Sequence, residues 1–157
     1  MNILNLLKDD HIRLSSELVK LRKNLNHPDI RGRIKHFISD YEAHESVEEE
    51  LLLPLLNDLK LCPCEVEALD KCHENHDDIW GLLDRLLEAV DSMRFPEFQM
   101  AFFHLVAVTE GHFGLEERIL FPTIERYMSA DALDKAGKTA EQRLSAYGAF
   151  EHSSRAA

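Results

Sequence analysis

One short pattern occurs twice in this chain, and it limits the fold and the chemistry more than any other feature. Each copy reads His-x3-Glu-Glu and reaches a proline ten residues after the histidine. The paired side chains are His44 with Glu48 and His112 with Glu116. On an α-helix, residues four apart project from the same face and lie about 6 Å apart along the axis. Each copy therefore predicts a helix that presents an imidazole and a carboxylate as neighbours.

The residues around each copy indicate that these pairs face inward. Apolar residues recur at steps of three or four on either side, so the histidine and glutamate lie on the apolar stripe of their helix. These flanking residues are Phe37, Tyr41 and Leu55 in the first copy, and Phe98, Phe102, Leu105 and Ile119 in the second. A buried glutamate is costly unless its charge is matched. The alternative is that both motifs lie on solvated helix faces and carry their histidines by chance. It would require a histidine and a glutamate to occur on the apolar side of the helix by chance in both copies.

Two further histidines occupy similar stripes. His11 lies in a leucine heptad stripe near the start of the chain, and His76 lies in a stripe that includes Leu69 and Leu83. The chain thus has two similar halves, each with a helix bearing one inward histidine and then a helix bearing His-x3-Glu. Folded together, they would bring four histidines and two glutamates to mid-bundle. The acidic residues beside these motifs are expected to be solvated: Asp9, Asp10, Glu42, Glu45, Glu49, Glu50 and Glu117. Of these, Glu45 or Glu49 could assist metal entry.

The periodicity predicts an all-α protein. Four helices are expected at about 1–24, 29–58, 65–93 and 96–127. Pro54 should bend or weaken the last turns of the second helix. Short connections between long helices favour an up-down-up-down four-helix bundle. We expect the bundle to span 1–128, a short fifth helix at 129–148 to pack on it, and a flexible tail to occupy 149–157.

The inward residues indicate more than one metal ion. Four histidines and two glutamates are too many ligands for one tetrahedral zinc ion, which takes four. Imidazole with carboxylate suits iron or manganese better than calcium or magnesium, which prefer oxygen ligands. Zinc stays an alternative, because it binds many nitrogen and oxygen sites more tightly than ferrous iron does.

The series His11, His44-x3-Glu48, His76 and His112-x3-Glu116 resembles the hemerythrin-like (HHE cation-binding) family over about residues 1–127. The resemblance implies a non-haem diiron site in a four-helix bundle, with two iron ions bridged by an oxo group and carboxylates. Manganese or zinc occupancy is compatible with it. The implied terminal ligands are His11, His44, His76 and His112, and the implied bridges are Glu48 and Glu116. The region from Ser129 is similar to the extra helix of many bacterial members.

The chain departs from the oxygen-carrying members of that family. Those proteins have His-x3-His on the third helix and His-x4-Asp on the fourth, whereas this chain has His-x2-His and His-x3-Glu. His73 is the candidate for a fifth histidine ligand, and without it a coordination position would be open or filled by water. Tyr41 lies one turn before His44 and is either a donor or ligand at the site or simply a core residue.

Composition excludes several classes of function. The 29 acidic and 18 basic residues give a formal net charge of −11, which argues against nucleic-acid or anionic-membrane surfaces. No apolar run approaches the roughly 20 residues of a membrane span and no signal-like segment opens the sequence, so we expect a soluble cytoplasmic protein. Cys62, Cys64 and Cys72 have no zinc-ribbon spacing and are expected to be reduced thiols in and beside a loop. A redox-active Cys-Pro-Cys is the alternative.

The leading functional hypothesis is a diiron protein that binds or senses a small diatomic molecule, O2 or NO, rather than a dedicated enzyme. No additional catalytic acid or base is evident in the sequence. The alternatives are a diiron oxidase or peroxidase-type stress protein, and iron storage or delivery, including iron–sulfur repair. Members of the family that repair iron–sulfur clusters carry a separate cysteine-containing N-terminal domain, which Cys62 and Cys64 do not match. No protein partner is indicated.

Overall fold

The computed structural model describes the backbone of residues 1–57 and 59–154, and the side chains of residues 1–57 and 59–146. Within these ranges the chain is helical and forms no strands. The long helices are α1 (Ile3–Lys23), α2 (Ile30–Val47), α3 (Pro63–Asp91), α4 (Phe95–Leu115) and α6 (Ala130–Ser154), and α5 (Phe121–Tyr127) is short. Three further helical segments are η1 (Glu48–Leu52), η2 (Leu53–Leu56) and η3 (Glu116–Leu120). The predicted all-α class is confirmed.

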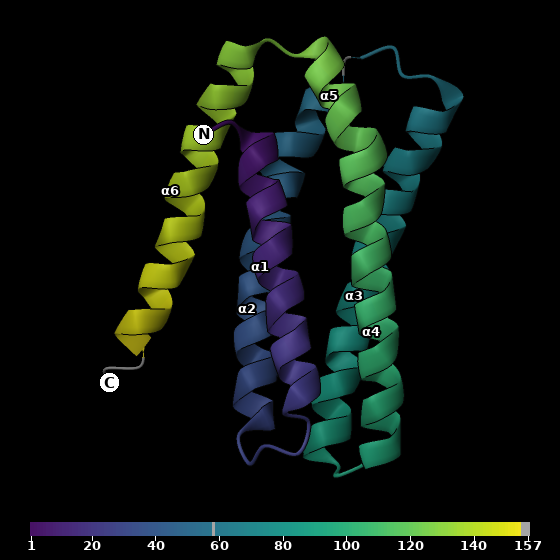
Figure 1. Ribbon diagram of the computed structural model, residues 1–157, viewed down its shortest axis with the longest axis vertical. Helices are drawn as coiled ribbons and strands as arrows, with labels where there is room; N and C mark the ends of the chain where they lie inside the picture. The colour runs from purple at the N-terminus through teal and green to yellow at the C-terminus, as the bar shows by residue number, and fades with distance from the viewer. Residues whose placement is uncertain (58, 155–157) are drawn as a thin grey trace.

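Helices α1 to α4 run alternately up and down side by side and form the bundle (Figure 1). The helix starts follow local chemistry. The Asn2 side chain accepts a hydrogen bond from the Asn5 backbone N–H at 2.9 Å and caps α1. At the start of α3, Glu65 accepts from the Cys62 N–H at 2.8 Å. Pro63 occupies the first turn of α3, where its missing N–H costs little.

Both His-x3-Glu copies end in the same backbone irregularity. The α-helical hydrogen-bond pattern stops at Val47 and at Leu115, and a π-helical segment begins with Glu48 in one copy and Glu116 in the other. A proline follows shortly after each segment and can neither donate a backbone hydrogen bond nor fit a regular turn. The wider π turn accommodates it, as such turns often do near functional sites. The expected weakening of the second helix before its end is therefore observed.

Among the residues whose side chains are described, the apolar core forms two clusters separated by a polar layer. One cluster includes Leu14, Phe37, Ile79 and Phe102, and the other includes Leu7, Val47, Leu52 and Ile124. His11 lies between Leu7 and Leu14 along α1, so it belongs to the layer between the clusters. The helices thus bury polar groups at one level of an otherwise apolar interior.

Helix α6 packs against α1 and α2 on the outside of the bundle (Figure 1). Gly137 lies so close to the first residues of the chain that a Cβ there would be 2.1 Å from the Met1 carbonyl oxygen. The helix is longer than expected, because it continues past Gly148 to Ser154. The tail expected at 149–157 is therefore helical as far as Ser154, and residues 155–157 lie outside the described residues.

None of the helices described between residues 1 and 154 has an apolar stretch sufficient to cross a membrane.

Candidate metal site

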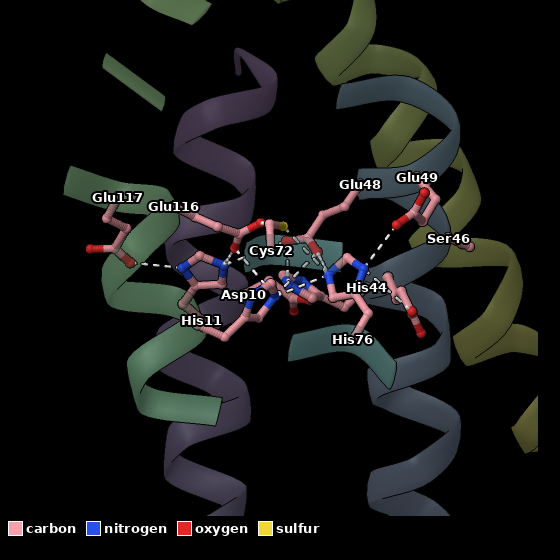
Figure 2. Close-up of polar contacts among 12 residues, drawn as sticks. Asp10, His11, His44, Ser46, Glu48, Glu49, Cys72, His76, Glu116 and Glu117 are labelled. Carbon is pink, nitrogen blue, oxygen red and sulfur yellow. Dashed lines mark hydrogen bonds and ion pairs between the residues drawn. The ribbon is translucent and has the colours of Figure 1, made fainter. Parts of the chain in front are cut away.

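The structure brings the six candidate ligands together in the polar layer. Figure 2 shows the convergence of His11, His44, Glu48, His76 and Glu116. Helix α1 supplies one histidine, α3 supplies another, and α2 and α4 each supply a histidine one turn before the glutamate that opens the π segment. All six residues are buried, with at most 3% of their surface exposed: His11, His44, Glu48, His76, His112 and Glu116. Their convergence follows from the apolar stripes, which turn these faces inward.

The first half of the site contains His11, His44, Glu48 and Glu116, whose ligand atoms lie within 4.8 Å of one another. His44 Nε2 is 2.7 Å from Glu48 Oε1, and His11 Nε2 is 3.2 Å from Glu116 Oε2. His11 Nε2 also lies 3.7 Å from Glu48 Oε1. Two imidazoles and two carboxylates therefore face one small volume.

The second half contains His76, His112 and Glu116, together with Cys72. His76 Nε2 is 3.2 Å from Glu48 Oε2, and His112 Nε2 is 3.7 Å from the same oxygen. Glu48 thus directs one oxygen toward each histidine pair. Glu116 belongs to both halves, so each carboxylate is placed where it could bridge two ions.

The orphaned atoms of this layer fit a metal site. The buried atoms His11 Nε2, His44 Nε2, both Glu48 oxygens and Glu116 Oε2 have no well-directed hydrogen bond among the described residues. They nevertheless approach one another at 2.7 to 3.7 Å. Buried polar atoms without partners are costly. Cations held between these nitrogen and oxygen atoms would satisfy them, and the donor set suits iron, manganese or zinc.

Three of the four histidines are held from behind by a carboxylate on a neighbouring helix. The contacts to the outer ring nitrogen, Nδ1, are Asp10 to His44 at 2.9 Å, Glu117 to His11 at 2.7 Å and Glu49 to His76 at 2.8 Å (Figure 2). Such partners keep the proton on Nδ1 and leave Nε2 free to bind metal. The expectation that Asp10 stays in water is wrong, because Asp10 is only 8% exposed. Glu49 and Glu117 are partly exposed, so these two carboxylates link the site to solvent.

The charges of the layer shift the pKa values of its groups. Burial by itself lowers the pKa of His44, but Glu48 and Asp10 outweigh it and raise that pKa to about 10. Burial likewise opposes protonation of His11 and His76, yet the neighbouring glutamates raise both pKa values to about 9. Burial opposes ionisation of Glu48, but the surrounding histidines hold its pKa well below the usual range. The glutamate is therefore a carboxylate that attracts cations.

His73 and Tyr41 lie at different distances from the site. His73 is half exposed, with Nδ1 3.3 Å from Glu49 Oε1, and it is absent from both buried groups among the described residues. Tyr41 is fully buried, and its hydroxyl has no hydrogen-bond partner among the described side chains. Its ring centroid lies 6.2 Å from that of His44. Burial and then the charge of Glu48 raise the pKa of the Tyr41 phenol, so it stays protonated.

The three cysteines are free thiols, as expected, but one of them is placed differently from the expectation. Cys62 and Cys64 are exposed free thiols at the start of α3, with their Sγ atoms 2.7 Å apart. Cys72 is in the middle of α3, not beside a loop, and is fully buried. Its Sγ atom lies 3.5 Å from Glu116 Oε1. The sequence signal that would have placed it is Cys72-x3-His76, which has the same spacing as the two His-x3-Glu pairs.

A surface pocket of about 350 Å³ reaches the site from between α1 and α4. Its lining includes His11, Phe113 and the carboxylates of Glu110 and Glu117. The imidazole of His11 stacks on Phe113 with the ring centroids 4.0 Å apart. The pocket therefore connects solvent to a histidine of the buried layer through an acidic opening.

A helical bundle with convergent histidines and carboxylates in its core has the architecture of a metal-binding four-helix protein. The family model described as the hemerythrin HHE cation binding domain matches residues 64–146, which is more than half of the 157 residues. The chain belongs to this family. The match covers α3 and α4, whereas His11, His44 and Glu48 lie before it. Neither a curated protein nor a solved structure matches the chain.

Proposed function

We propose that this protein holds two non-haem iron ions in the polar layer and there binds or senses a small diatomic molecule, O2 or NO. One observation carries the proposal: two buried groups of ligands share Glu116, while the two oxygens of Glu48 face different histidine pairs. In this assignment His11 and His44 hold one ion, His76 and His112 hold the other, and the two glutamates bridge them. The iron would supply the electrons that bind the diatomic, and the apolar clusters on both sides would exclude water.

The metal assignment is tested by loading the protein with ferrous iron without oxygen and measuring iron per chain. The wild type should hold two. His112→Ala should lose at least one ion, and His104→Ala is the matched control, because His104 lies on the same helix but is exposed. A full complement of iron in His112→Ala would sink the assignment.

The ligand assignment is tested on the reduced, iron-loaded protein. Oxygen, and in a second sample NO, is added while the visible spectrum is followed, and the solution is then returned to argon. A charge-transfer band that appears and then bleaches supports reversible binding. If the band instead disappears irreversibly as the iron is oxidised to the ferric state, the result would favour a diiron oxidase or peroxidase-type protein.

The acidic pocket at His11 favours a second candidate, which is iron storage or delivery. Glu110 and Glu117 would attract cations to the pocket, and His11 lines the same pocket. This function requires that iron leaves readily. Slow loss of ferrous iron to a chelator, unchanged in Glu110→Gln, would count against it.

A further inference from the structure

Cys72 lies where a ligand of the second ion would lie. Its Sγ atom is 3.5 Å from Glu116 Oε1 and 3.9 Å from His76 Nε2. Sγ and the ligand atoms of His76, His112 and Glu116 are all within 4.8 Å of one another. In Figure 2 the sulfur atom lies among the converging side chains beside Glu116. The thiol is therefore part of the polar layer, although apolar residues pack around it.

Cys72 lies four residues before His76, which is the spacing of the two His-x3-Glu pairs. Helix α2 with the following η1 presents His44 and Glu48, and α4 with the following η3 presents His112 and Glu116, each pair four residues apart. Helix α3 presents Cys72 and His76 at the same spacing. Three helices thus each direct two side chains of metal-ligand type into one layer, and α1 adds a single histidine.

Counting donors shows what the thiol adds. The first half of the site has two histidines and two carboxylates. With the shared glutamates, His76 and His112 give the second half the same two imidazoles and two carboxylates, and Cys72 adds a further donor of a different chemical type. A buried cysteine is often a small apolar core residue, but here the sulfur faces a carboxylate and an imidazole rather than the neighbouring leucines alone.

We propose that Cys72 binds the second metal ion through its sulfur, so that the two ions have chemically different ligand sets. The inference rests on the proposed metal site. When the ion binds, the S–H bond gives way to a metal–sulfur bond and the proton passes to solvent, with no change of oxidation state. A thiolate is a softer and more strongly donating ligand than imidazole. A preference for zinc or cobalt over manganese should therefore be stronger in this half of the site than in the half that contains His11 and His44.

The test is X-ray absorption at the zinc edge, with the full chain loaded with zinc ions. Zinc–sulfur bonds are about 2.3 Å long and zinc–nitrogen or zinc–oxygen bonds about 2.0–2.2 Å, so sulfur is resolved as a separate shell. Cys62→Ser/Cys64→Ser is the decisive sample, because Cys72 is then the remaining cysteine. Cys72→Ser is the complementary variant, and its zinc affinity should fall at least about tenfold, as occurs when supporting groups of a metal site are lost.

The expected result is a sulfur shell in the wild type and in Cys62→Ser/Cys64→Ser, and none in Cys72→Ser. Two zinc ions with only nitrogen and oxygen neighbours in Cys62→Ser/Cys64→Ser would overturn the role of Cys72 and leave the proposed function intact. A sulfur shell that disappears in that double variant would assign the sulfur to the exposed pair and also overturn the inference. Failure of the wild type to bind any metal would instead remove the proposed function itself.

Discussion

Replacing Asp10 with asparagine should weaken metal binding without removing a proposed ligand. The Asp10 carboxylate lies 2.9 Å from His44 Nδ1, and Arg13 donates to its other oxygen at 2.6 Å. The charge of Asp10 favours a proton on Nδ1, which leaves His44 Nε2 free. Asparagine has the same shape but no charge and can turn its amide NH2 toward the imidazole. Loss of such a partner lowers metal affinity about 10- to 100-fold.

This loss can be read from thermal unfolding. With free metal at about 1,000 times the dissociation constant, binding stabilises the wild type by about 4.1 kcal/mol. The gain falls to about 2.7 kcal/mol when affinity drops tenfold, and to about 1.4 kcal/mol when it drops a hundredfold. For a chain of this size each kcal/mol shifts Tm by about 2–4 °C. The increase in Tm on adding metal should therefore be at least about 3–6 °C smaller in Asp10→Asn than in the wild type.

Asp9→Asn is the matched control, because Asp9 is the preceding residue, carries the same charge and is exposed. The metal-induced gain in Tm is compared for each variant with its own metal-free sample, so a change in bundle stability cancels. Asp9→Asn should behave like the wild type. Equal losses in the two variants would show that net charge, not the orientation of His44, controls affinity and would refute the reasoning.

Three more predictions concern the metal-free protein and two glycines, Gly137 in α6 and Gly81 in α3. The three histidines with raised pKa favour the folded state while protonated, so their contribution is complete below about pH 6.5 and is lost as pH rises through about 9 to 10. The urea midpoint after metal removal should fall over that range, and a flat profile would contradict this. Gly137→Ala should destabilise by about 1–3 kcal/mol, since its Cβ would meet backbone atoms of Met1 and Asn2. Gly81→Ala, whose Cβ would meet no described atom within 4 Å, should stabilise by about 0.5–1 kcal/mol in the same urea assay.

The sequence was sufficient to predict the bundle and the layer of polar residues, because both depend on spacing within single helices. An apolar stripe fixes which face turns inward, and residues four apart on that face stay neighbours whatever the rest of the chain does. The same rule applies to Cys72, which lies four residues before His76, but the nearby Cys-Pro-Cys sequence favours a position in or beside a loop for all three cysteines. Glycine is a common signal for a helix end, so the sequence predicts an end near Gly148, whereas α6 continues to Ser154.

The carboxylates behind the histidines could not be predicted in this way, because every one of these contacts joins two helices. Asp10 reaches from α1 to His44 on α2, Glu49 reaches from η1 to His76 on α3, and Glu117 reaches from η3 to His11 on α1. Asp10 is adjacent to His11 in sequence, about 100° around the helix, and whether that direction meets water or another helix depends on how the neighbour is rotated and shifted. The orientation of each histidine is thus a property of a pair of helices. His112 on α4 has no such carboxylate among the described residues, since its Nδ1 atom has no hydrogen-bond partner. The ring of His112 is therefore positioned by packing and by the contact of its Nε2 atom with His76 Nε2 at 3.1 Å, without a carboxylate at Nδ1, and a bound ion would do most to fix it.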